Sequence, residues 1–170
     1  MSGLPISVKS ARVAIGVALA GLLAAPGFVL SQSLEEQIAG AWRIVSIYNE
    51  VKGVKRHFYG ENPVGLAIFE RSGYVSVFLS KAELPRFAAS NRLKGTDKEY
   101  REVMQGMIAQ FGTYTVEGDE VVFKWIASSY PNRAGSTEKR VFKIAGDQMT
   151  AVNPTAASGG TSYVNYVRAK

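Results

Sequence analysis

An arginine inside an apolar, strand-like run has the clearest chemical potential in this sequence. Arg140 shares one face of residues 139–144 with Phe142 and Ile144, because alternate residues of a strand point to the same side. If that face is buried, the guanidinium group needs a partner, since an unpaired buried charge is costly. The partner is either a carboxylate, ring or carbonyl group of the protein, or the carboxylate of a bound ligand.

Two tyrosines and two loop arginines are further candidates for binding. Tyr74 and Tyr114 lie among apolar and aromatic neighbours, where a hydroxyl group bonds either a ligand or the edge of the core. Arg86 and Arg133 fall in expected loops, where charged side chains either close over a binding site or stay solvated.

Residue counts exclude several classes of chemistry. The sequence has no Cys and one His, which excludes disulfide scaffolds, thiol catalysis and most zinc sites. It contains no Gly-x-Ser-x-Gly elbow, phosphate loop or dinucleotide fingerprint. Glu35 and Glu36 are adjacent on a short expected helix and point apart, so they do not form a glycosidase pair. We predict no catalytic residue, metal or cofactor.

Length and composition predict one globular domain. The chain has 170 residues, of which 46% are hydrophobic, enough for a core. Its formal net charge is +6, and the basic residues form no dense stripe, so we expect no nucleic-acid partner.

Residues 1–32 resemble a secretory signal peptide. Lys9 and Arg12 precede the apolar run 13–25, and Pro26-Gly27 interrupts it. A membrane anchor is the alternative, but a spanning helix needs about 20 apolar residues. We therefore expect cleavage near Ser31, a mature domain over residues 33–170 without a stable membrane anchor, and a periplasmic or secreted location.

The mature chain predicts many short strands after a helical segment at residues 33–39. Eight runs are rich in β-branched and aromatic residues, at 42–48, 64–69, 74–79, 112–116, 121–126, 139–144, 148–152 and 163–168. Gly118-Asp119 and Gly146-Asp147 predict tight hairpins between neighbouring strands.

One amphipathic helix is expected between the third and fourth strands, over residues 96–110. Thr96 and Glu99 form a capping-box pattern at its start. Its apolar face is expected to point inward and comprises Tyr100, Val103, Met104, Met107 and Ile108.

Eight hairpin-linked strands and one helix predict an all-β fold. A sandwich is possible, but tight connections favour an up-and-down barrel, in which closure removes the edge strands. About eight strands leave room for packed side chains or one small ligand.

Ordered motifs across residues 38–168 resemble the lipocalin-like domain of bacterial and fungal proteins of the calycin type. They are Gly40-Ala41-Trp42-Arg43 with Arg168, Asn62-Pro63-Val64-Gly65, Arg71–Val77, Pro85-Arg86-Phe87-Ala88, Phe111-Gly112-Thr113-Tyr114, Gly118-Asp119, Tyr130-Pro131-Asn132, Gly135 and Arg140. The resemblance implies an eight-stranded barrel whose closed end holds Trp42 beside Arg168. That pair is either a structural cation–π contact or a ligand-stacking site.

Two departures from the family pattern add candidate residues. Arg133 follows Asn132 where the family commonly has Trp, and Trp125 lies on a strand where polar, His-type residues are familiar. The family has no single function, so the resemblance implies a ligand-binding barrel without identifying the ligand.

Two functions remain open. The first is an exported binding protein for a small, largely apolar or amphipathic molecule, neutral or anionic. The second is a cofactor-independent isomerase or cyclase acting on an apolar substrate in the barrel. The candidate ligand-binding residues are Arg140, Tyr114, Tyr74, Arg86, Trp125, Asn132 and Arg133. The sequence does not determine the oligomeric state.

Overall fold

A computed structural model describes residues 1, 3, 32–156 and 159–170. The chain divides into two units, Met1–Ser31 and Gln32–Lys170, and the expected signal peptide lies almost wholly outside the described residues. Within the described residues, no helix is long and apolar enough to cross a membrane.

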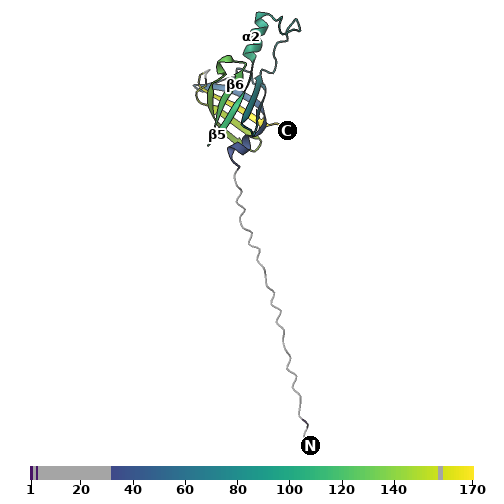
Figure 1. Cartoon of the computed structure of the whole chain (residues 1–170), viewed down its shortest axis with the longest axis vertical. Helices are drawn as coiled ribbons and strands as arrows, with labels where there is room; N and C mark the ends of the chain where they lie inside the picture. The colour runs from purple at the N-terminus through teal and green to yellow at the C-terminus, as the bar shows by residue number, and fades with distance from the viewer. Residues whose placement is uncertain (2, 4–31, 157–158) are drawn as a thin grey trace. The chain divides into compact units, whose positions relative to one another are not determined.

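The unit Gln32–Lys170 is mostly β-structure (Figure 1). Its strands are β1 (Gly40–Val51), β2 (Val54–Arg56), β3 (Val64–Phe69), β4 (Tyr74–Ser80), β5 (Met107–Glu117), β6 (Glu120–Ser128), β7 (Thr137–Ala145), β8 (Gln148–Asn153) and β9 (Thr161–Arg168). Its helices are α1 (Leu34–Ile38), α2 (Asp97–Gly106) and the 3-10 turn η1 (Pro131–Arg133).

Eight of these strands close into an antiparallel barrel. Each pairs with the next along the chain from β3 to β9, and the long β1 pairs with both β3 and β9. A bulge between Ile44 and Ser46 interrupts the β1–β9 register, and bulges increase the local bend of a strand. The short β2 pairs only with the end of β1 and adds a ninth strand beside the closed ring. The predicted eight-stranded up-and-down barrel is thus confirmed.

One end of the barrel is closed by packing. Trp42 is fully buried, and its indole Nε1 donates a hydrogen bond to the Ile38 carbonyl of α1 at 2.7 Å. The guanidinium group of Arg168 lies 4.1 Å from the centroid of the Trp42 ring. Arg168 also donates to the carbonyl groups of Gln37 and Ala39, at 2.9 and 3.2 Å. Of the two readings of this pair, the contacts favour the structural one.

A second bulge shapes the β5–β6 pair. The register shifts between Phe111 and Gly112, and Gly112 then faces Trp125. A Cβ atom on Gly112 would lie 2.1 Å from the Lys124 carbonyl oxygen, closer than any side chain permits. Glycine is therefore required here by the close approach of the two strands.

The expected helix is shorter than its pattern suggested. The capping box of Thr96 and Glu99 forms as predicted, but α2 ends at Gly106. Met107 and Ile108 belong to β5, where Met107 pairs with Ser80 and Ile108 with Leu79.

The apolar face of α2 also does not point into the barrel. Met104 is 52% exposed. Tyr100 packs against Phe87 with ring centroids 5.6 Å apart, and its hydroxyl oxygen accepts a hydrogen bond from the Gly95 N–H at 2.8 Å. The expectation of an inward face was wrong for these two residues, because Met104 is largely exposed and Tyr100 packs on the loop before α2.

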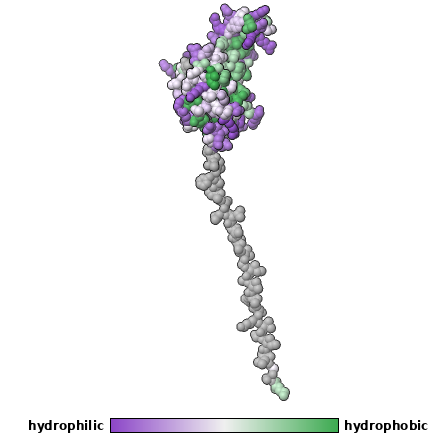
Figure 2. Space-filling model, viewed as in Figure 1, coloured by the Kyte–Doolittle hydropathy of each residue, from purple (hydrophilic) through white to green (hydrophobic). Residues whose placement is uncertain are grey.

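Strands β3, β4 and β5 carry apolar residues on their outer as well as their inner faces. Hydrophobic side chains lie among polar ones on the barrel face in Figure 2. The exposed apolar residues of these three strands are Val64, Leu66, Ile68, Tyr74, Phe78 and Phe111.

Candidate functional site: a cavity at the open end of the barrel

A cavity of about 630 Å³ occupies the barrel interior beyond the closed end, a volume typical of small-molecule sites. One part of its wall is apolar, because inward-pointing residues of β1, β4, β5 and β9 meet there. These residues are Ile44, Ile47, Val77, Leu79, Ile108 and Val164.

Aromatic side chains from two loops line the outer part of the cavity. Phe58 and Tyr59 follow β2, and Tyr130 precedes η1. Phe58 and Tyr130 are about half exposed, so each presents a ring both to the cavity and to solvent. Planar rings in this position suit contact with the apolar or aromatic body of a ligand.

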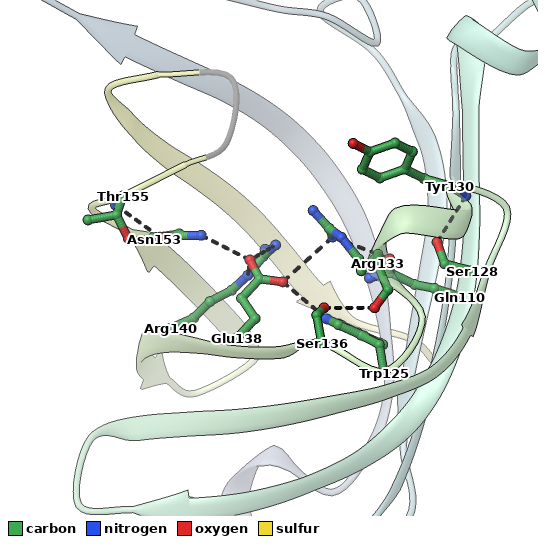
Figure 3. A network of polar contacts seen from close by, with 10 residues as sticks. All are labelled: Gln110, Trp125, Ser128, Tyr130, Arg133, Ser136, Glu138, Arg140, Asn153 and Thr155. Carbon is green, nitrogen blue, oxygen red and sulfur yellow. Dashed lines mark hydrogen bonds and ion pairs between the residues drawn. The ribbon is translucent and has the colours of Figure 1, made fainter.

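Another part of the wall is polar and centres on Glu138 of β7 (Figure 3). Its Oε1 accepts hydrogen bonds from Arg140 Nε and Nη2, at 3.0 and 2.8 Å, and from Asn153 Nδ2 at 2.9 Å. Its Oε2 accepts one from Trp125 Nε1 at 3.1 Å. The carboxylate is therefore largely satisfied by the protein itself.

Arg133 approaches the same carboxylate from η1. Its Nη1 lies 3.6 Å from Glu138 Oε2 and donates a hydrogen bond to Gln110 Oε1 at 3.2 Å. The backbone around it is tied down, because its N–H donates to the Tyr130 carbonyl at 3.0 Å and its carbonyl accepts from Ser136 Oγ at 2.7 Å.

Three titratable groups at the cavity have shifted pKa values. Burial alone would raise the pKa of Glu138, but the charges of Arg140 and Arg133 and the hydrogen bonds from Arg140 and Trp125 outweigh it and hold that pKa below its ordinary value. Burial raises the pKa of Tyr166 to about 12 and also raises the pKa of Tyr59. Glu138 is thus anionic at neutral pH, and both phenols are protonated.

The charged residues that line the cavity, among those described, are Arg133, Glu138 and Arg140. Two cations and one anion leave a formal charge of +1 on this wall. The described residues contain no cluster of three or more His, Cys, Asp or Glu side chains able to hold a metal ion.

Four of the seven predicted site residues meet at this wall. Arg140, Asn132 and Arg133 line the cavity. Trp125 is buried just behind it, where it stacks on Phe123 with ring centroids 5.0 Å apart and donates to Glu138.

The other three lie elsewhere. The Tyr114 hydroxyl group donates to the Glu70 carbonyl at 3.0 Å, in the turn before β4. Tyr74 begins β4 with its side chain 55% exposed. Arg86 lies in the loop before α2 and does not line this cavity. Tyr114 points into the packed core, where its ring contacts Phe69, whereas Tyr74 points away from the barrel interior.

Sequence reasoning missed Glu138, Gln110 and Asn153. Glu138 had a detectable signal, because it stands two residues before Arg140 and alternation puts both on one face of a strand. The helical pattern extends to Gln110 and the strand pattern before Asn153 ends at residue 152, so neither residue has a predicted inward strand position.

The family comparison agrees with the fold, and two further similarities are found. A family model described as a lipocalin-like domain matches residues 39–167. The 4′-hydroxy-3′-methoxypropiophenone carrier protein ppsC of Aspergillus oryzae (strain ATCC 42149 / RIB 40) is 33% identical over 85 residues, which cover 44% of this chain and 77% of that protein. A crystal structure of an uncharacterized protein from Bacteroides eggerthii DSM 20697 aligns with a TM-score of 0.41 and 14% identity, over 76% of this chain and 98% of that one.

Proposed function

Because this chain belongs to the lipocalin-like domain family, we propose that it carries a small, largely apolar molecule inside its barrel. The observation that carries the proposal is the cavity of about 630 Å³, which both apolar and polar side chains line. A pocket with apolar walls and a few placed polar groups both shelters a ligand and orients it.

The A. oryzae relative supports the carrier role. Its name describes a carrier of a propiophenone, a small molecule with an aromatic ring and polar oxygen substituents. For the present chain we propose a ligand of similar character: an apolar body lying between Ile47, Val77 and Ile108, and an oxygen-bearing end, neutral or anionic, facing Gln110 and Arg133.

A matched pair of substitutions on β4 tests this assignment. Val77 lines the cavity, whereas its neighbour Phe78 is exposed on the outer face. Val77→Trp fills part of the cavity and is expected to weaken binding of the neutral fluorescent probe N-phenyl-1-naphthylamine about tenfold or more. Phe78→Trp is expected to leave its binding within about twofold of the original protein.

Two results would contradict the carrier role. One is that the folded protein fails to bind the probe at all. The other is equal binding to the original protein and to Val77→Trp, which would place the probe outside the barrel. Circular dichroism and thermal unfolding of both variants show whether the barrel remains folded.

We also propose that the protein is exported and that residues 1–32 are removed. The support is the pattern of Lys9 and Arg12 before an apolar run that Pro26 interrupts. Intact-mass measurement of the protein from fractionated cells tests it. We expect a mature chain that begins near Gln32 or Ser33 outside the cytoplasm, and a membrane-bound chain retaining residues 1–32 would contradict export with cleavage.

A further inference from the structure

We infer that the carried molecule is a small monoanion, with a carboxylate as its acidic group, and that Arg133 rather than Arg140 is its charge partner. This inference rests on the proposed carrier function, and it names the chemical class of the ligand and the residue that selects it.

Arg140 is already occupied. Its Nε and Nη2 both donate to Glu138 Oε1, at 3.0 and 2.8 Å, so the guanidinium group meets a carboxylate of its own strand. The side chains of Arg140 and Glu138 are 15% and 14% exposed, which keeps the pair poorly accessible to solvent. A ligand carboxylate would have to displace Glu138 in order to bind Arg140 through the same two donors.

Arg133 is less fully used. Its Nη1 donates to a neutral amide oxygen of Gln110, and it lies 3.6 Å from Glu138 Oε2, longer than a hydrogen bond. Within the part of the chain that the structure describes, its Nε and Nη2 have no hydrogen-bond partner at all. Guanidinium nitrogens form a planar fork that matches the two oxygens of a carboxylate.

The position of Arg133 also suits a ligand. Its side chain is 23% exposed, and it lines the same cavity as Tyr59 and Tyr130. In Figure 3 the guanidinium group of Arg133 lies beside the Glu138 carboxylate, where it approaches Oε2, whereas Arg140 donates to Oε1. The hydrogen bonds that hold the backbone of residues 130–136 keep this group in place before a ligand arrives.

The formal charge of the cavity wall indicates how many negative charges the ligand carries. Arg133, Glu138 and Arg140 sum to +1, so one negative charge on the ligand neutralises the charged wall. A cationic ligand would face a net positive wall whose one carboxylate already accepts four hydrogen bonds. A dianion would leave one negative charge uncompensated in a partly buried site.

Three pyrene probes of matched shape test the inference. Pyrene-1-butyrate is anionic, its methyl ester is neutral, and pyrene-1-butylamine is cationic. Fluorescence titration of the full chain is expected to give the highest affinity for the butyrate and the lowest for the amine. Arg133→Met is expected to lower butyrate affinity about tenfold or more and to change ester affinity less than about twofold.

Three further variants assign the effect. Arg133→Lys keeps the positive charge and is expected to restore part of the preference for butyrate over the ester. Arg86→Met removes an arginine outside the cavity and is expected to change neither affinity. Glu138→Gln raises the formal charge of the wall to +2, so butyrate affinity is expected to rise while ester affinity stays constant.

The outcomes separate this inference from the proposed function. If neither the butyrate nor the ester binds, the carrier function itself fails. If both bind equally and Arg133→Met changes nothing, the carrier function stands and the anionic ligand class is wrong. If Arg140→Met, rather than Arg133→Met, abolishes the preference for butyrate in a folded protein, the assignment to Arg133 is overturned.

Discussion

Glu138 and Arg140 lie two residues apart on β7, and one carboxylate oxygen of Glu138 accepts hydrogen bonds from two nitrogens of Arg140, at 3.0 and 2.8 Å. The sequence left the partner of Arg140 open between the protein and a ligand. The structure provides a protein carboxylate as that partner. The Glu138–Arg140 pair lies at the centre of the polar wall of the cavity.

Removing Arg140 should therefore reduce stability. Arg140→Met leaves Glu138 without its closest cation in a partly buried setting, and we expect a loss of about 1–3 kcal/mol in the free energy of unfolding. The double variant Arg140→Met/Glu138→Gln should lose less free energy of unfolding than the two single variants lose together, because the two side chains interact. Urea unfolding of the four proteins in this cycle measures the coupling, and strict additivity would contradict it. Lys143→Met, on the exposed face of β7, is the control.

Acid should weaken the fold in part through Glu138. Its pKa in the folded protein lies below the ordinary value of 4.5, so the unfolded chain takes up the proton first as pH falls. The stabilisation is fully present above about pH 4.5 and is lost as pH falls through the lower pKa of the folded state. Thermal unfolding between pH 7 and pH 3 should show a weaker pH dependence for Glu138→Gln than for the original chain. If melting temperature changes with pH by the same amount in both proteins, Glu138 does not contribute to the loss of stability in acid.

The helical pattern places Met104 and Ile108 on one face, but α2 ends between them. Met104 is 52% exposed, so Met104→Asp should change the unfolding free energy by about 0.5 kcal/mol or less. Ile108 packs against the buried core from β5, so Ile108→Asp should cost about 2 kcal/mol or more. Equal shifts in melting temperature would mean that both side chains still belong to one helical face.

Arg168 should contribute to stability at the closed end. Arg168→Met removes the contact with the Trp42 ring and two hydrogen bonds to carbonyl groups near α1, with an expected cost of roughly 1–3 kcal/mol. Lys170→Met is the matched control, because Lys170 and Arg168 both lie near Asp147 but Lys170 is largely exposed. A loss of probe binding without a loss of stability would instead revive a ligand role for the Trp42–Arg168 pair.

The barrel could be predicted because short sequence patterns determine most of its strands and turns. Alternating apolar residues and the Gly-Asp turns at 118–119 and 146–147 define most strands and their antiparallel connections. The end of α2 could not be predicted in the same way. Gly106 stands at the change from helix to strand, but the apolar helical spacing continues through Met107 and Ile108, and Ile108 satisfies both periodicities.

The candidate site was only partly predictable for a related reason. Alternation gave the inward face of Arg140, and the same rule could have found Glu138. The position of Arg133 depends on η1 turning the β6–β7 connection towards the cavity, which is a property of three-dimensional closure. Residue type alone could not distinguish Arg133, which lines the cavity, from Arg86, which does not.

Native mass spectrometry of the protein purified from its own cells tests the carrier role most directly. We expect a one-to-one complex with a small organic molecule, retained by Phe78→Trp and lost from Val77→Trp, because only the second substitution fills the cavity. If the ligand is the monoanion inferred above, Arg133→Met should also reduce its occupancy. A bound molecule that Val77→Trp retains at the occupancy of the original protein, in a folded barrel, would contradict binding in this cavity.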